Sequence, residues 1–202
     1  MNRRDFLKGA GAGLACTAVY PNILKMALNL PKRPNILFLF SDDHACQSIS
    51  AYGGRLSSIA PTRNIDRIAS EGALFKRNFC ANSICAPSRA CVLTGKHSNL
   101  NGQRTNGDTF DGSQQTFPKL FQQAGYKTAL IGKWHLRSTP TGFDHWMIYP
   151  GQGDYYNPEY ITPEGKKQIT GYSVEVTTDL ALDWMKQQEG TDKPFLMMCQ
   201  YK

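Results

Sequence analysis

Two adjacent carboxylates occupy the first position in this sequence where side chains suggest chemistry. Asp42 and Asp43 directly follow an apolar run of strand length, Asn35 to Phe40. Ligands bind at the carboxyl edge of an open α/β sheet, and hard oxygens that converge there suit Ca²⁺, with Mg²⁺ as the alternative. An isolated pair of aspartates is more often a solvated turn or a helix N-cap, so the pair alone does not decide between these readings.

A cysteine and an arginine form the second cluster, in the stretch Cys85-Ala86-Pro87-Ser88-Arg89. Pro87 favours the first turn of a helix, which places Cys85 just before a helix N-terminus. Backbone N–H groups at that end favour negative charge and anions. On these residues alone, Cys85 is a nucleophile with a lowered pKa, a disulfide partner or a small buried residue.

A lysine and a histidine form the third cluster, Lys133-Trp134-His135, after a predicted strand from Tyr126 to Ile131. Alternation in an extended segment would place Lys133 and His135 on the same side. Taken alone, a Lys-Trp-His sequence is usually no more than a strand end at the surface.

Apolar runs and helical spacing indicate the elements that must position these side chains. Strands are predicted at 35–40, 73–79, 126–131 and 195–201, and helices at 62–71, 117–124 and 173–188, with Ser173 as a cap. Strands that alternate with helices indicate an α/β fold with a mostly parallel sheet flanked by helices. The first strand is expected to be buried on both faces. The long loop 139–171 is expected to contribute to a surface or a site.

Composition and charge exclude several classes of protein. Hydrophobic residues make up 41% of the chain and charged residues 19%, which is typical of a globular protein. The net charge of +7 includes no run of five like charges, so nucleic acid is not an expected partner. No stretch approaches about 18 apolar residues, so no membrane span is expected.

The N-terminus has the anatomy of an export signal. Arg3 and Arg4 precede Phe6-Leu7-Lys8 and a Gly/Ala-rich, weakly apolar run, which resembles a twin-arginine signal. We therefore expect a periplasmic or extracellular protein that uses the export machinery. Residues 1–30 would form the signal and linker, and residues 34–202 the remaining domain. A lipid anchor at Cys16 is the alternative, although Gly13 does not suit it.

The other cysteines do not indicate a metal site. The spacing of Cys80, Cys85 and Cys91 lacks the paired motif of structural zinc sites, and no histidine falls between them. A disulfide between Cys80 and Cys91 cannot be read from sequence, and the state of Cys46 and Cys199 is equally open.

Longer motifs around these clusters resemble the type I sulfatases of the alkaline-phosphatase-like superfamily. The stretch from Cys85 to Gly95 is similar to the C-x-P-x-R signature of that family, with Val92 in place of the usual Leu or Phe. The stretch from Gly125 to His135 is similar to the second signature, and Asp42-Asp43 makes a third match. The resemblance spans residues 35–135.

The resemblance implies a catalytic role for each cluster. Cys85 would be oxidised to formylglycine by a maturation enzyme, and its hydrated aldehyde would attack a sulfate ester. Asp42, Asp43 and residue 85 would hold a Ca²⁺ ion. Arg89 would stabilise the ionised diol, Lys133 would contact sulfate, and His135 would act as a base.

A weaker resemblance concerns the substrate. The segments around Arg104, Asn106 and Asp108 look like those of carbohydrate sulfatases that act on glucosamine-6-sulfate, so these three residues are candidate contacts to a sulfated saccharide. Two alternatives stay open: a phosphate or phosphonate ester hydrolase of the same superfamily, and an inactive anion-binding fragment. The last predicted strand ends at the C-terminus with nothing to cover it, so we expect the N-terminal part of a catalytic domain, inactive alone.

Overall fold

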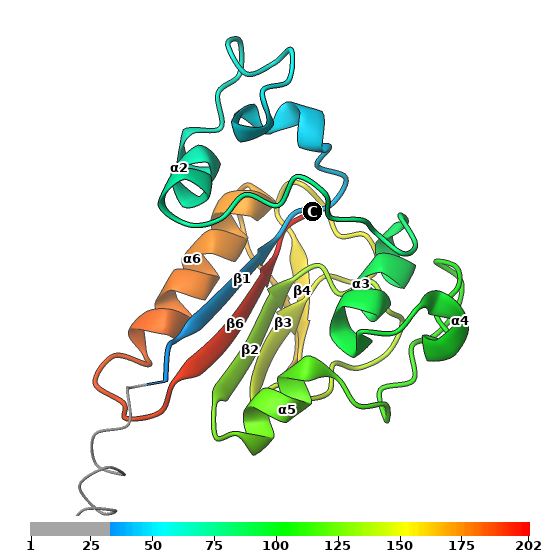
Figure 1. Cartoon of the computed structure of the whole chain (residues 1–202). Coiled ribbons are helices and arrows are strands. Elements are labelled where there is room, and N and C mark those ends of the chain that lie inside the picture. Colours follow the sequence, from blue (N-terminus) through cyan, green and yellow to red (C-terminus); the bar gives the residue numbers. More distant parts are fainter. Residues whose placement is uncertain (1–32) are drawn as a thin grey trace, which may run out of the picture. The chain divides into compact units, whose positions relative to one another are not determined.

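A mixed sheet organises the part of the chain that the structure describes (Figure 1). This structure is a computed structural model that describes residues 33–202; the predicted signal and Cys16 lie outside that range. Within it, the strand order is β1-β6-β2-β3-β4-β5. The first four strands in this order form three parallel pairs, and β4 and β5 continue the sheet in antiparallel pairs. The strands are β1 (Ile36–Phe40), β6 (Phe195–Gln200), β2 (Lys127–Gly132), β3 (His145–Ile148), β4 (Glu159–Thr162) and β5 (Gly165–Gln168).

The two central strands carry the core. All but the first residue of β2 is buried, and the same is true of β6. Their register pairs Thr128 with Leu196 and Gly132 with Gln200. Such continuous apolar strands bury both faces because helices cover a parallel sheet on each side. The prediction of a mostly parallel α/β sheet is confirmed.

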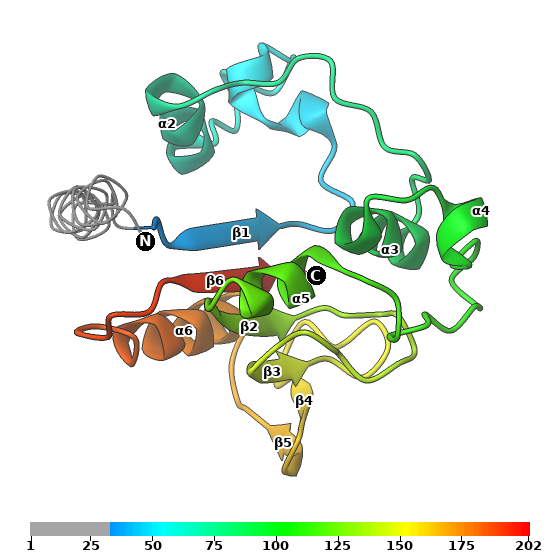
Figure 2. The ribbon, with the colours of Figure 1, turned by 60° about the horizontal axis from the view of Figure 1, so that its bottom comes forward.

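Helices cover opposite faces of the sheet, as Figure 2 shows. Helix α6 (Ser173–Lys186) packs Val176, Ala181 and Trp184 against inward side chains of β2 and β6. On the other face, α3 (Cys85–Thr94) packs its small buried residues against Leu130 and Met198. Helix α5 (Phe117–Gln123) lies on the same face as α3, and short α4 (Ser98–Asn101) follows α3.

Helix α3 packs closely against the sheet and ends abruptly at a glycine. Ala86 and Ala90 are fully buried, so the helix backbone lies close to the strands. The helix ends at Gly95, whose φ of 65° is left-handed and whose N–H donates to the carbonyl of Cys91. Cys85 is the first helical residue, and the sequence prediction had placed it just before the helix.

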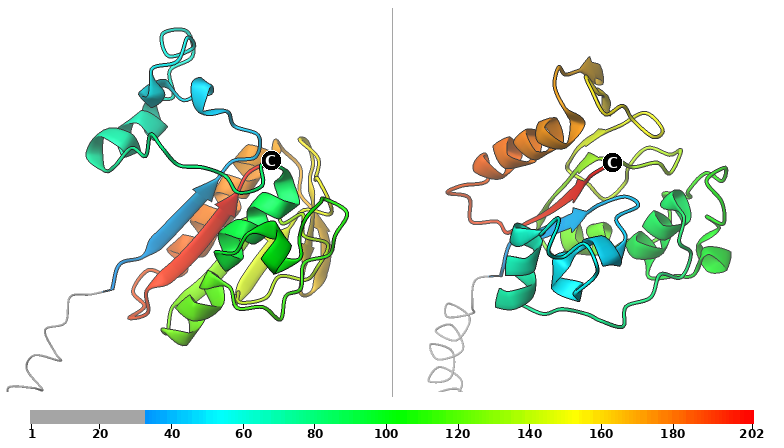
Figure 3. Two further views of the ribbon diagram at one scale, coloured as in Figure 1. Left: turned by 45° about the vertical axis from the view of Figure 1, so that its right-hand side comes forward. Right: turned by 90° about the horizontal axis from the view of Figure 1, so that it is seen from above.

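The first strand differs from its prediction. Leu37 is 47% exposed and Leu39 50% exposed, so one face of β1 is exposed, and the other face is only partly buried. The reason is its place in the sheet: β1 is an edge strand beside β6, and α6 packs over β6 and β2 instead (Figure 3).

The segment after β1 also departs from prediction. Residues 73–79 form no strand, and Phe75 and Phe79 are 70% and 87% exposed. Strand propensity alone does not supply a pairing partner. The segment before it holds two short 3₁₀ helices, η1 (Cys46–Ser48) and η2 (Ser50–Tyr52), and α2 (Arg63–Glu71). Asp66 of α2 accepts from the N–H of Ala51 at 2.8 Å, which ties α2 to η2.

The predicted long loop contains three strands. Residues 139–171 include β3, β4 and β5, each of only four residues. Strands this short, separated by glycine and proline, are too brief for alternation to reveal. Ser173 begins α6 but makes no capping bond; Tyr172 holds the N-cap position.

No helix among residues 33–202 combines the length and apolar character that crossing a membrane requires.

Candidate functional site

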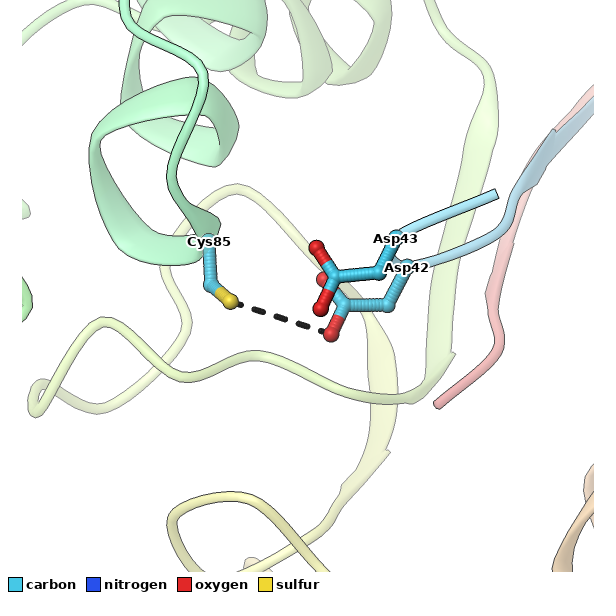
Figure 4. A group of neighbouring side chains, drawn as sticks. All are labelled: Asp42, Asp43 and Cys85. Atoms are coloured by element: carbon cyan, nitrogen blue, oxygen red, sulfur yellow. Dashed lines mark hydrogen bonds between the residues drawn. The ribbon is translucent and has the colours of Figure 1, made fainter. Parts of the chain in front are cut away.

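The three predicted clusters meet at the carboxyl edge of the sheet, where β1 and β2 end and α3 begins. Figure 4 shows the side chain of Cys85, at the start of α3, directed toward the carboxylates of Asp42 and Asp43. The Cys85 thiol lies 3.7 Å from Oδ2 of Asp42. One ligand atom from each of these three residues lies within 4.8 Å of the others. They line a small cleft of about 250 Å³, here called the Cys85 cleft, together with Phe40, His44, Cys80, Ser83, Ile84, Ser88 and Arg89.

Asp42 is the electrostatic centre of the cleft. Its Oδ1 accepts from Arg89 at 3.1 Å, and its Oδ2 accepts from the ammonium of Lys133. Burial acts to raise the pKa of Asp42, but the Lys133 hydrogen bond and the charges of Arg89 and Lys133 outweigh it. The net result is a pKa below the ordinary value, so the carboxylate is ionised at neutral pH.

Arg89 is buried, with 2% of its side chain exposed, and joins several elements. Its Nη1 donates to the carbonyl oxygen of Lys133 at 2.7 Å and to the side chain of Gln200, at the end of β6. Its guanidinium carbon lies 5.1 Å from the centre of the Phe40 ring. Burial lowers the pKa of Arg89, and the neighbouring Asp42 opposes that shift. An arginine titrates so far above neutrality that the guanidinium keeps its charge and fixes the strand ends around Cys85.

Lys133 extends from the end of β2 into the cleft. Its Nζ donates to Asp42, donates to Oε1 of Gln152 at 2.5 Å, and lies 3.9 Å from Sγ of Cys85. The preceding residue must be glycine, because a Cβ on Gly132 would lie 1.9 Å from the carbonyl oxygen of Gln200, and its φ is 109°. The close contact of β2 with β6 therefore sets the position of Lys133.

The backbone at His135 differs from the prediction, and His135 is not among the residues that line the Cys85 cleft. The strand ends at Gly132, and His135 has a φ of 56°, so the segment is not extended there. Burial lowers the pKa of His135, and the positive charges of Lys133 and Arg89 lower it further. A neutral imidazole beside two cations suits a proton acceptor.

The candidate substrate residues lie near the start of α3 in different ways. Oδ1 of Asn106 accepts from the N–H of Ala86 at 3.0 Å, which caps a helix whose N-cap residue, Ile84, offers no side-chain bond. The carboxylate of Asp108 accepts from the N–H groups of Arg104 and Thr105, both at 2.9 Å. Asn106 is thus adjacent to Cys85, Asp108 orders its own loop, and the Arg104 side chain is exposed.

The cysteines make no disulfide among the described residues. Cys46, Cys80, Cys85, Cys91 and Cys199 are all free. His44, which follows the aspartates, lines the Cys85 cleft, and its Nδ1 lies 3.3 Å from the Ser41 hydroxyl.

The donor set fits a hard cation. Asp42 and Asp43 present carboxylate oxygens, and one ligand atom of each lies within 4.8 Å of the other and of the Cys85 thiol. A thiol is a poor ligand for Ca²⁺, so residue 85 completes the set only when it presents oxygen.

Sequence reasoning missed two glutamines of the site. Gln200 binds Arg89, and Gln152 binds Lys133. The position of Gln200 at the end of a predicted strand was a usable signal, because that edge binds ligands. Gln152 could not be predicted, because the stretch around it shows neither helical nor strand periodicity. In the structure, Lys202 contacts the loop that carries Gln152: its ammonium donates to the carbonyl of Gly153 and lies 4.2 Å from the centre of the Tyr155 ring.

Comparisons with known proteins agree with this geometry. Residues 34–202 match the sulfatase family model, and residues 1–19 match the twin-arginine translocation pathway signal sequence. The chain is 51% identical over 175 residues to an N-acetylglucosamine-6-O-sulfatase of Bacteroides thetaiotaomicron, covering 85% of this chain and 30% of that protein. It is 37% identical over 144 residues to the human N-acetylgalactosamine-6-sulfatase, covering 61% of this chain and 27% of that protein.

Solved structures extend the comparison. A protein in complex with its substrate D-glucosamine-2-N,6-O-disulfate superposes with a TM-score of 0.80 at 50% identity, covering 84% of this chain and 34% of that one. A phosphonate monoester hydrolase of Agrobacterium radiobacter has a TM-score of 0.63 at 20% identity, covering 84% of this chain and 40% of that one, and shares the fold. The chain therefore spans about a third of the length of these relatives.

Proposed function

The chain belongs to the sulfatase family, and we propose that it supplies the reacting residue, two metal ligands and the first sulfate contacts of a carbohydrate sulfatase. The observation that carries the proposal is the convergence of Cys85, Asp42 and Lys133 at one edge of the sheet. Sulfate is an anion, and this cleft combines a helix N-terminus with two cationic side chains.

The reacting group is formylglycine, made from Cys85 by a maturation enzyme. When present, its hydrated aldehyde supplies one hydroxyl that attacks sulfur, which breaks the bond to the sugar oxygen, and a second hydroxyl whose deprotonation expels sulfate and restores the aldehyde. A serine at this position would lack the second hydroxyl and would keep the sulfate as an ester.

The side chains around residue 85 have distinct tasks. Lys133 binds sulfate as a point charge, exchanging its bond with Gln152 for one with the substrate. His135 accepts the proton of the second hydroxyl, for which its lowered pKa leaves the imidazole neutral. Arg89 is held by Gln200 and Asp42, and its charge favours the ionised form of the residue-85 hydroxyl.

Asp42 and Asp43 would hold Ca²⁺ together with an oxygen of residue 85. When bound, the ion supplies a positive charge that increases the acidity of the hydroxyl and offsets charge on the sulfuryl group. Because Ca²⁺ takes 6–8 oxygens, further ligands come from outside this pair.

We assign the substrate as a saccharide with sulfate on O6 of glucosamine. The relatives at 50–51% identity are an N-acetylglucosamine-6-O-sulfatase and a protein bound to D-glucosamine-2-N,6-O-disulfate. Arg104 and Asn106, on the loop that caps α3, are candidate contacts to that sugar, with Asp108 ordering the loop. The twin-arginine signal indicates export, so the substrate is met in the periplasm or outside the cell.

Intact mass and sulfate release test the proposal. Conversion of Cys85 lowers the mass of the exported protein by about 18 Da, the change from thiol to aldehyde. Cys85→Ala removes that change, and in a version restored to the full length of the relatives it abolishes release of sulfate from 6-O-sulfated N-acetylglucosamine. Cys91→Ala is the matched control, since Cys91 lies in the same helix and outside the Cys85 cleft.

Three results would each contradict part of the assignment. An unmodified Cys85 in active protein would exclude the formylglycine mechanism. Faster turnover of phosphate monoesters than of sulfate esters would replace the sulfatase with the related phosphate or phosphonate hydrolase. Faster release from 4-O-sulfated N-acetylgalactosamine would discard the sugar but keep the reaction.

A further inference from the structure

A second hollow, here called the Trp146 pocket, lies beside the Cys85 cleft. It has a volume of about 440 Å³, within the range of small-molecule sites. Its lining includes apolar side chains, among them Trp146 and Ile148 of β3 and Ile161 of β4, and also the polar side chains of His135, Arg137 and Gln152.

The pocket and the reacting centre share side chains. Gln152 lines the pocket and accepts from Lys133, whose Nζ lies 3.9 Å from Sγ of Cys85. His135, the proposed base, also lines the pocket. A molecule whose sulfate binds Lys133 would therefore extend directly into this pocket.

The charged side chain that lines the Trp146 pocket is positive, and no negative charge accompanies it. None of its lining residues is acidic, and Arg137 forms no ion pair with any carboxylate among residues 33–202. Arg137 is exposed and close enough for its charge to lower the pKa of His135. The lining thus offers an unpaired cation to a ligand.

The backbone around Arg137 is also unusual. His135 and Arg137 have φ values of 56° and 57°, on either side of Leu136, which is fully buried. Left-handed conformations are costly for such side chains and persist where the surroundings hold them, commonly at functional sites. Here the buried Leu136 fixes the segment, and both flanking side chains line the pocket.

We propose that the Trp146 pocket binds the sugar ring of the substrate and that Arg137 binds a second anionic group on it. The inference rests on the proposed function, because the first sulfate must lie at Lys133. A pyranose has apolar C–H faces that pack on an indole, and its charged substituents form strong hydrogen bonds with a guanidinium. The pocket then selects saccharides that carry two anionic groups over those that carry one.

Binding of two sugars to the intact chain tests this, with tryptophan fluorescence and calorimetry as readouts. The probes are glucosamine 6-O-sulfate and glucosamine 2-N,6-O-disulfate. The wild type should bind the disulfate about tenfold more tightly, the magnitude of one charged hydrogen bond. Arg137→Asn should remove that preference, because asparagine tolerates the left-handed backbone without the charge, and Arg137→Lys should restore part of it.

Two further variants complete the design. Trp146→Leu keeps the core apolar and should weaken both sugars by a similar factor while reducing the fluorescence change. Arg77→Asn, at an exposed arginine outside both hollows, should change neither affinity.

The inference is overturned if Arg137→Asn keeps the disulfate preference or if it weakens both sugars equally. Formylglycine at residue 85 and sulfate release from a 6-O-sulfated sugar would stand in both cases, which separates this failure from that of the proposed function. Binding of neither sugar by the wild type would overturn the inference together with the glucosamine assignment, and the intact mass would then still report on formylglycine.

Discussion

Asp42 combines two tasks in the Cys85 cleft, and the neighbouring Asp43 has only one of them. Asp42 is a proposed Ca²⁺ ligand and also the carboxylate that neutralises Arg89 and Lys133, whereas Asp43 is exposed and has no ion pair among the described residues. Removing the charge of Asp42 leaves two buried cations facing each other, while removing that of Asp43 affects the metal alone.

We therefore expect Asp42→Asn and Asp43→Asn both to weaken Ca²⁺ binding but to differ in stability. In excess chelator, Asp42→Asn should lower the free energy of unfolding by about 3 kcal/mol, as expected when a buried ion pair loses one partner. Asp43→Asn should stay within about 0.5 kcal/mol of the wild type. Calorimetric titration and thermal unfolding measure the two effects. Unchanged Ca²⁺ affinity in both variants would refute the metal assignment.

His135 should determine the acid limb of the pH–rate profile. Burial and the charges of Lys133, Arg89 and Arg137 hold its pKa below the ordinary 6.5. The base must be neutral, so kcat should fall as pH drops through that lowered pKa, and the limb should lie below pH 6.5. Arg137→Asn removes one positive charge and should move the limb to higher pH, with Arg77→Asn as control. A wild-type limb at or above pH 6.5 would argue against His135 as the base.

The site residues that sequence predicted and those it missed differ in chemistry. Asp42, Asp43, Cys85 and Lys133 could be predicted because they lie in motifs that resemble sulfatase signatures; taken alone, each of them also had a structural interpretation. Gln152 and Gln200 were not predicted, because an amide is common everywhere and only the fold brings these two to Lys133 and Arg89. The path of His135 was mispredicted because a left-handed residue leaves no trace in side-chain pattern.

At the scale of elements, the close contact between β2 and β6 at Gly132 also determines the geometry of the site, because Lys133 follows Gly132 directly. Gly132→Ala would place a Cβ against the carbonyl of Gln200 in a left-handed backbone. We expect it to cost about 3 kcal/mol or more and to displace Lys133. Gly107→Ala, whose added Cβ meets only the Thr105 hydroxyl at 3.4 Å, is the control. Thermal unfolding measures both, and equal stability would contradict the packing argument.

The elements themselves were predictable where burial is two-sided. The runs that became β2 and β6 are continuous and apolar because helices cover both faces. Residues 73–79 look similar but have no neighbouring strand to pair with, and nothing within the segment encodes that absence. The exposed face of β1 depends on its edge position, which is a property of strand order and not of local sequence.

For the whole molecule, export should depend on Arg3 and Arg4. The matched signal sequence covers residues 1–19, and its arginine pair is the feature that the pathway reads. Arg3→Lys with Arg4→Lys should abolish or strongly reduce periplasmic protein, measured by cell fractionation and immunoblot. Arg33→Lys, outside the matched residues, should leave the yield unchanged. Normal export of the double variant would refute the dependence.

The pairing of the first strand with the last also sets a schedule for synthesis. Asn35 and Phe195, joined by a 3.1 Å hydrogen bond, are 160 positions apart, so the ribosome must add that many residues after Asn35 before β1 can pair with β6. Arg89 and its partner Gln200 are 111 positions apart, a stretch that takes on the order of 5–20 s at about 5–20 residues per second. During that interval Arg89 lacks its partner Gln200, so the proposed maturation enzyme would meet Cys85 before the contacts around it are complete.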